Sequence, residues 1–276
     1  MNKTRLLSGV IIAMIIVPCL LWLPLNFLTL LISIIASLSA WEFFRLRFSL
    51  EISLLLSLIL FFSVIYLSFG IAFQLTLSSI GILIWMVLGL LILGFPHNKD
   101  ILQNNFFWFF SGFFIHISFC VSLFLIANYP EPLLNSIGVG LSPRATLVFL
   151  ISLSAVMDSL AYFGGKKFGK RKFLSNISPN KTLEGFVIAV LGTPLILMPI
   201  LALFYEYNFF KVLMIIFLVS IFSVVGDATA SLFKRISGVK DSSNVIPGHG
   251  GIFDRIDSHL AAAPCFVLLA YVIQKI

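Results

Sequence analysis

Charged side chains are scarce in this 276-residue chain. Asp, Glu, Lys and Arg make up 11% of its residues, whereas about 25% is typical of soluble domains. Hydrophobic residues make up 60%, and the mean hydropathy is +1.10. A chain of this length cannot bury that much apolar surface in one aqueous core. The composition therefore excludes an ordinary soluble protein and indicates an integral membrane protein.

Cysteine and histidine are also rare, with three and four residues. Cys19, Cys120 and Cys265 lie far apart in apolar runs, which predicts small buried side chains rather than a disulfide or zinc framework. His116 lies in an apolar run without an acidic neighbour and is expected to be a packed core residue. No basic and aromatic pattern typical of nucleic-acid binding occurs, so no nucleic-acid partner is expected.

Long apolar runs fill most of the chain. A helix needs about 20 apolar residues to cross a bilayer. The first run is expected to be a retained helix rather than a signal peptide, because no small-x-small cleavage site follows it. The sequence predicts an all-α integral membrane protein with about nine transmembrane helices, near residues 6–23, 26–44, 51–69, 73–94, 106–128, 145–163, 186–205, 209–232 and 258–275.

The basic residues orient these helices. Cytoplasmic loops of membrane proteins are enriched in Lys and Arg. With the N-terminus in the cytoplasm and alternating sides, fifteen of the 18 lysines and arginines lie inside, and only Arg144, Lys211 and Lys275 lie outside. This partition supports nine helices and places the C-terminus on the opposite side. Short loops and compact size suggest a multi-pass protein of a bacterial inner membrane.

Polar motifs concentrate in the second half of the chain. Residues 1–145 are predicted to form an N-terminal transmembrane scaffold that contacts lipid. Residues 146–276 are predicted to form a transmembrane catalytic region within the same continuous membrane domain. No internal repeat of the kind common in transporters is evident.

Two aspartates of this second half lie within apolar runs. Asp158 and Asp227 each cost about 2.5–3.5 kcal/mol at the middle of a spanning helix, so such residues usually face a cavity or a partner. Gly226 beside Asp227 allows close approach of a ligand or another helix. The alternative is that both aspartates lie near cytoplasmic helix ends and extend to the membrane surface.

The segment 231–257 concentrates charge between two apolar runs, with four basic residues and three aspartates. Its aspartates, Asp241, Asp254 and Asp257, suit a hard cation such as magnesium, and the last two share a helical face. Helix capping is the alternative for that pair. The glycine-rich turn 247–251 can bring backbone close to an anion. Four basic residues could neutralise phosphate, with membrane topology as the alternative: Lys234, Arg235, Lys240 and Arg255.

The other inside loop, 164–185, contains a second group of candidates. Lys181 and Glu184 resemble site residues in the pattern Ile-Ser-Pro-Asn-Lys-Thr-Leu-Glu-Gly. The alternative is a capped helix start, with Ser178 as the cap and Pro179 at the first helical position.

These patterns together resemble the signature of the phosphatidate cytidylyltransferases, also called CDP-diglyceride synthetases. The upstream segments Asp158–Gly169 and Ile177–Gly185 are also similar to that family. Together the matches cover about the C-terminal 40% of the chain. The signature positions in the main segment are Ser231, Lys234, Arg235, Lys240, Asp241, Pro247, His249, Gly250, Gly251, Asp254, Arg255 and Asp257.

The resemblance implies a membrane enzyme that makes CDP-diacylglycerol and pyrophosphate from CTP and phosphatidic acid with Mg²⁺. By the resemblance, the catalytic residues are Asp227, Lys234, Arg235, Lys240, Asp241, His249, Asp254, Arg255 and Asp257. The substrate-binding residues are Asp158, Lys181, Glu184, Ser231, Gly250 and Gly251. The metal ligands are Asp227, Asp254 and Asp257.

Alternatives to this interpretation stay open at this point. A polyprenol kinase or a CDP-archaeol-type synthase shares the CTP chemistry but uses another acceptor. A transporter would spread its charges through several helices. The active site is expected to face the cytoplasm, with CTP, phosphatidic acid and membrane lipid as partners, and a homodimer is left open.

Overall fold

The computed structural model describes residues 3–66, 70–129, 133–246, 248 and 250–275. Within these ranges no β-strand occurs, and only two isolated bridges, Lys172–Thr182 and Ile246–Gly250, pair extended backbone. The predicted all-α class is therefore confirmed. The elements are α1 (Lys3–Trp22), α2 (Leu25–Arg45), α3 (Leu50–Tyr66), α4 (Ile71–Leu93), α5 (Lys99–Leu102), α6 (Asn105–Asn128), the 3₁₀ turn η1 (Asn135–Ile137), α7 (Pro143–Phe168), α8 (Leu183–Ala202), α9 (Phe209–Ile236) and α10 (Phe253–Lys275).

Each of the nine predicted runs coincides with a helix in the described ranges. Seven of these helices are long and apolar enough to cross a membrane. The other two are shorter apolar helices, Gly9–Trp22 within α1 and Leu50–Tyr66. The chain is thus a multi-pass membrane protein, and the number nine stays a prediction.

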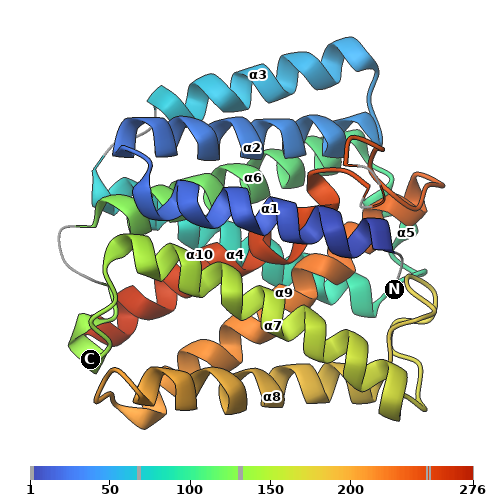
Figure 1. The fold of residues 1–276 in the computed structure, drawn as a ribbon. Helices are drawn as coiled ribbons and strands as arrows, with labels where there is room; N and C mark the ends of the chain where they lie inside the picture. The colour runs from blue at the N-terminus through green and yellow to red at the C-terminus, as the bar shows by residue number, and fades with distance from the viewer. Residues whose placement is uncertain (1–2, 67–69, 130–132, 247, 249, 276) are drawn as a thin grey trace.

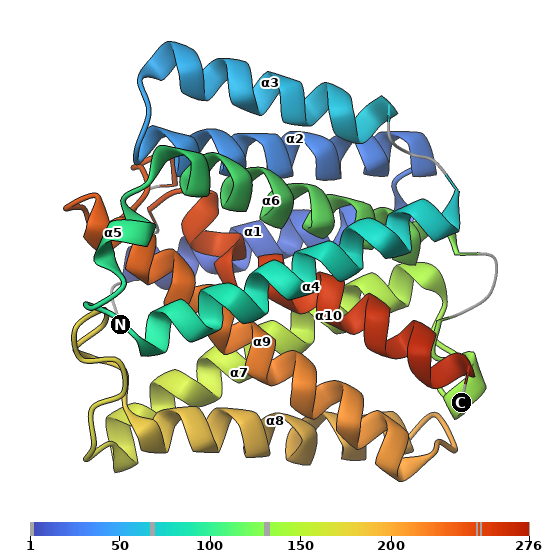
Figure 2. The ribbon, with the colours of Figure 1, turned by 180° about the vertical axis from the view of Figure 1, so that it is seen from behind.

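The long helices run between two ends of the molecule (Figures 1 and 2). At one end lie the N-terminus, α5 and the two long loops 169–182 and 237–252; we call it the long-loop end. The C-terminus lies at the opposite end. Since consecutive long helices alternate in direction, segments far apart in sequence meet at the long-loop end.

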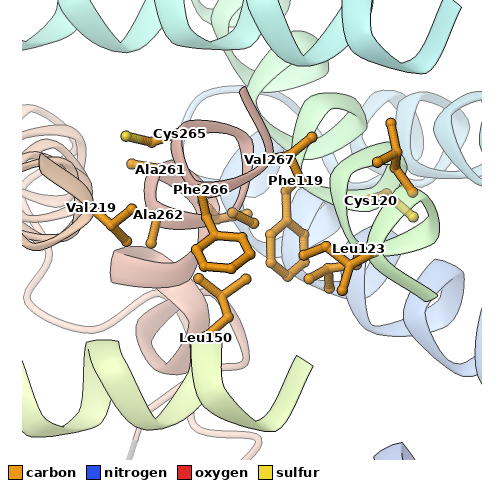
Figure 3. Packing of buried hydrophobic residues seen from close by; sticks show 14 of the residues in the cluster. Phe119, Cys120, Leu123, Leu150, Val219, Ala261, Ala262, Cys265, Phe266 and Val267 are labelled. Atoms are coloured by element: carbon orange, nitrogen blue, oxygen red, sulfur yellow. The ribbon is translucent and has the colours of Figure 1, made fainter. Parts of the chain in front are cut away.

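Helix α10 lies at the centre of the bundle. It packs against α2, α4, α6, α7 and α9. Its segment Leu260–Val267 is buried and includes three consecutive alanines, which allow neighbouring helices to approach closely. Figure 3 shows Phe266 of α10 near Leu150 of α7 and Phe119 of α6. The N-terminus of α10 is therefore held among several helices.

A cluster of buried aromatic rings packs beneath the loop 237–252. Phe43 of α2 lies 4.9 Å from Phe233 of α9 and 5.5 Å from Phe253 of α10, measured between ring centroids. Trp108 of α6 lies 4.6 Å from Phe233. Edge-on aromatic contacts of this kind stabilise beyond the area they bury. The cluster fixes the relative positions of four helices where the polar residues begin.

His116, Cys120 and Cys265 are buried core residues, as predicted, whereas Cys19 is half-buried. The His116 ring lies 3.0 Å from Ser39 Oγ and 2.7 Å from the Gly112 carbonyl oxygen. All three cysteines are free, and two of them are buried.

Candidate active site

Three aspartates from three helices meet at the long-loop end. Asp158 of α7 is close enough to Asp227 of α9 and Asp257 of α10 to interact with both charges, and Asp257 also interacts with Asp227. We call these residues the aspartate cluster. Gly226 makes the approach of α9 and α10 feasible, because a β-carbon there would collide with the backbone of Asp257.

One lysine from the loop 169–182 reaches the aspartate cluster. Lys181 Nζ lies 2.8 Å from Asp227 Oδ2 as an ion pair without hydrogen-bond geometry. The Asp227 side chain is 35% exposed, so a ligand can reach it. The Lys181 side chain is 23% exposed, but its Nζ atom is buried against Asp227. Asp158 is also exposed, although it lies ten residues before the end of α7. A helix rises 1.5 Å per residue, so this carboxylate lies about 15 Å from the helix end.

Three carboxylates inside spanning helices, one exposed and two half-buried, require a polar environment. Hydrocarbon does not solvate a carboxylate, so these side chains must face water, a cation or substrate. Ser258 provides one polar contact, donating from Oγ to Asp158 Oδ2 at 3.2 Å. With Lys181, the three aspartates carry a formal charge of −2 when all four side chains are ionised.

A second acidic site lies at the start of α10 and differs from the first in its surroundings. Asp254 forms a buried ion pair with Lys234 of α9 through Oδ1. Its Oδ2 accepts from Ser242 N at 2.8 Å, Ser242 Oγ at 2.9 Å and Gly251 N at 2.9 Å. Asp254 therefore fixes the loop 237–252 to α9 and α10, and its oxygens are already occupied.

Glu42 of α2 contacts the same loop, and the sequence interpretation missed it. Its Oε1 accepts from Ser243 Oγ at 2.7 Å, and its Oε2 accepts from Ser242 Oγ and Phe253 N, both at 2.8 Å. The signal was present, because Glu42 is a carboxylate at the end of an apolar run, the criterion that selected Asp158 and Asp227. Glu42 was not selected, because residues 1–145 were predicted to form only a scaffold that contacts lipid.

The loop 169–182 is held mainly by its own ends. Glu184 accepts from the backbone amides of Lys170 and Arg171 at 2.9 and 3.1 Å, and its Oε1 accepts from Arg171 Nε at 3.0 Å. The alternative of a helix start at Ser178 and Pro179 is wrong: α8 begins at Leu183, and Thr182 caps it by accepting from Gly185 N. Glu184 thus supports the loop that presents Lys181.

The remaining predicted residues lie around these two groups. Arg235 donates to the Ile177 carbonyl oxygen at 3.3 Å and so joins α9 to the loop 169–182. Gly250 and Gly251 lie directly beside Asp254. Ser231 is half-buried on α9, His249 lies outside the described residues, and the exposed members are Lys240, Asp241 and Arg255.

The predicted metal ligands do not form a single set. Asp227 and Asp257 belong to the aspartate cluster, while Asp254 is engaged by Lys234 and the loop 237–252. Across the described residues, no group of three or more His, Cys, Asp or Glu side chains is arranged to hold a metal ion. Mg²⁺ usually takes one or two carboxylates plus water and substrate phosphate. Asp227 and Asp257 fit that smaller requirement.

Comparison with known proteins matches the sequence of this chain to one family. The sequence model of the cytidylyltransferase family matches residues 3–273. The chain belongs to the cytidylyltransferase family. The match covers both halves of the chain, so the helices that carry Glu42 and those that carry the aspartate cluster all belong to the cytidylyltransferase unit.

Several curated relatives of this cytidylyltransferase chain are bacterial phosphatidate cytidylyltransferases. The Bacillus subtilis protein is 36% identical over 97% of this chain and 97% of its own length. The Pseudomonas aeruginosa protein is 29% identical over 98% of this chain and 97% of its own length. The Haemophilus influenzae protein is 46% identical, but the match covers 44% of this chain and 43% of that protein.

Proposed function

We propose that this chain transfers the cytidylyl group of CTP to phosphatidic acid, giving CDP-diacylglycerol and pyrophosphate for phospholipid biosynthesis. The observation that carries the proposal is the aspartate cluster with Lys181 at its edge, in a chain similar along its length to phosphatidate cytidylyltransferases. Carboxylates that can hold a divalent cation, with a lysine beside them, suit a nucleotide triphosphate and a lipid phosphate.

The reaction requires one phosphorus–oxygen bond to form and one to break. An oxygen of the lipid phosphate attacks the α-phosphorus of CTP, and the bond to the β-phosphate oxygen breaks so that pyrophosphate leaves. The lipid phosphate is already anionic, so positioning and charge neutralisation dominate. Lys181, which reaches the open cluster, is placed to neutralise phosphate oxygens, and Asp254 holds Lys234 and the loop 237–252 in position.

We propose Mg²⁺ as the cofactor, held by Asp227 and Asp257 with Asp158 close by. The formal charge of −2 at the aspartate cluster suits a divalent cation. When bound, Mg²⁺ would neutralise triphosphate charge. Asp254 is better suited to holding the loop, because four donors already surround its oxygens.

The direct test is an activity assay of purified protein in detergent with labelled CTP. Phosphatidate, a polyprenol and an archaeal-type ether-lipid phosphate are offered separately as acceptors, with Mg²⁺ or with EDTA. We expect a labelled CDP-lipid from phosphatidate, lost with EDTA and restored by Mg²⁺. Labelling of the polyprenol alone would contradict the proposed acceptor, and full activity in EDTA would contradict the cofactor.

We also propose that the long-loop end faces the cytoplasm of a bacterial cell, with the protein in the inner membrane. The distribution of basic residues supports this orientation, because cytoplasmic loops are enriched in Lys and Arg. The basic residues that lie away from the long-loop end are Arg144, Lys211 and Lys275. A membrane-impermeant maleimide applied to intact spheroplasts should label the K211C variant and leave K240C unlabelled. The reverse pattern would invert the topology.

A further inference from the structure

Glu42 is a buried carboxylate in a position that its own helix disfavours. It is 1% exposed and lies three residues before Arg45, the last residue of α2. A negative charge in the last turn of a helix meets the negative end of the helix dipole, which is unfavourable. Some other element must therefore stabilise this side chain.

The stabilising element is the start of α10 with the loop before it. Among the described residues no ion pair involves Glu42, and its partners are the hydroxyls of Ser242 and Ser243 and the amide of Phe253. Phe253 is the first residue of α10, so Glu42 caps that helix from α2. The positive end of the α10 dipole favours the charge that the end of α2 disfavours.

The contacts of Glu42 continue to the buried ion pair without a break. Ser242 Oγ lies 2.8 Å from Glu42 Oε2 and 2.9 Å from Asp254 Oδ2. A hydroxyl has one proton, so it donates to only one of the two carboxylates at a time. Asp254 in turn binds Lys234. The chain Glu42–Ser242–Asp254–Lys234 therefore links α2, the loop 237–252, α10 and α9.

The fit around Glu42 is close. A β-carbon on Gly251 would collide with Glu42 Oε2 and Ser242 Oγ, so the glycine leaves room for this contact. Gly251 also donates its amide to Asp254. Gly251 thus contacts both carboxylates, one through the space that its missing side chain leaves and the other through its amide.

We propose that Glu42 is a positioning residue for the transfer reaction: it clamps the loop 237–252 and the start of α10, and thereby holds Asp254 and Lys234 beside the aspartate cluster. The proposal rests on the proposed cytidylyl transfer and extends it, because it gives the N-terminal helices a role in forming the site. Second-layer partners of this kind orient the groups that contact ligand, and their loss typically lowers activity.

The test combines two measurements on E42A, E42Q and S243A, with E51A as the matched control at an exposed glutamate. Amide hydrogen exchange in detergent reports the clamp without any substrate. We expect faster exchange in the segment 242–254 of E42A, unchanged exchange in 173–183, and no change in E51A. Unchanged exchange across 242–254 in E42A overturns the proposal.

Steady-state kinetics on folded, monodisperse protein reports positioning. We expect kcat of E42A to fall about 10- to 100-fold. The E42Q side chain can still accept from Phe253 N and donate to Ser243 Oγ, so it should restore kcat to within about fivefold of wild type. S243A should lose about two- to fivefold, because it removes one of three hydrogen bonds.

The two measurements distinguish positioning by Glu42 from an effect on stability alone. They also show whether a failure concerns Glu42 or the proposed function. Lower thermal stability with unchanged kcat in every Glu42 variant that folds would overturn positioning. If E42A does not fold, E42Q and S243A decide by the same two measurements. If wild type forms no CDP-lipid, the proposed function fails, and hydrogen exchange alone decides whether the clamp exists.

Discussion

Two groups of carboxylates lie at the same end of the molecule and differ in what surrounds them. The aspartate cluster, Asp158, Asp227 and Asp257, is open to a ligand and has few hydrogen-bond donors. Glu42 and Asp254 are buried, and donors surround their oxygens. Carboxylates without enough partners are suited to bind something, whereas satisfied carboxylates hold a loop in place. The two groups should therefore respond differently to mutation.

The largest expected effect is on stability, from breaking the buried ion pair. Asp254→Ala leaves Lys234 charged and unpaired in the interior, which costs about 3–5 kcal/mol. We expect a lower thermal midpoint in detergent together with loss of activity. Replacing both residues, as K234M with D254L, should recover part of the stability without activity. If the thermal midpoint of Asp254→Ala were unchanged, Asp254 would not stabilise the fold, and the contrast with the aspartate cluster would be wrong.

The next effect falls on activity alone. Asp227→Asn removes a charge from the aspartate cluster and is expected to lower kcat about 10²- to 10³-fold. Its stability should change little, because relief of the repulsion from Asp158 and Asp257 offsets the weakened ion pair with Lys181. The matched control is Asp100→Asn, an exposed aspartate at the same end. Normal Mg²⁺-dependent turnover in Asp227→Asn would refute its metal role.

A smaller effect is expected where the loop meets Glu42. Gly251→Ala inserts a β-carbon against Glu42 and Ser242 and should cost about 1–3 kcal/mol by overpacking. Activity should fall with it, because the displaced backbone weakens the hydrogen bond from the amide of residue 251 to Asp254. Gly70→Ala is the control, since a β-carbon there meets no atom within 4 Å. Equal thermal midpoints for the two variants would show that the loop adapts freely.

The smallest effect is expected at the other loop. Thr182→Ala removes the cap of α8 and should cost about 1 kcal/mol. Lys181 directly precedes Thr182 in the loop, so a modest rise in the KM for CTP should accompany the change, with kcat nearly constant. Thr182→Ser keeps the hydroxyl and should behave like wild type. A large fall in kcat for Thr182→Ala would assign this loop a closer role than we propose.

Much of this comparison was visible in the sequence. Asp158 and Asp227 were identified because a charged side chain in a membrane-spanning run raises the free energy of insertion and is usually functional. The pairing of Asp254 with Asp257 on one helical face was a weaker inference. The two residues are three positions apart in the sequence. Even so, the Asp254 carboxylate contacts Lys234 and Ser242, whereas the Asp257 carboxylate interacts with Asp227. Spacing along a helix does not tell which neighbouring helix lies on either side.

The sequence by itself determined the membrane class, the helix positions and the location of most charge at one end, because hydropathy and basic residues act through local composition. Only the tertiary structure decided which carboxylates are open and which are satisfied, since their partners lie up to 211 positions away in the chain. Glu42 shows the difference most clearly. Its apolar surroundings mark it as unusual, but its role depends on the Ser242 hydroxyl and the Phe253 amide, which only folding brings to it.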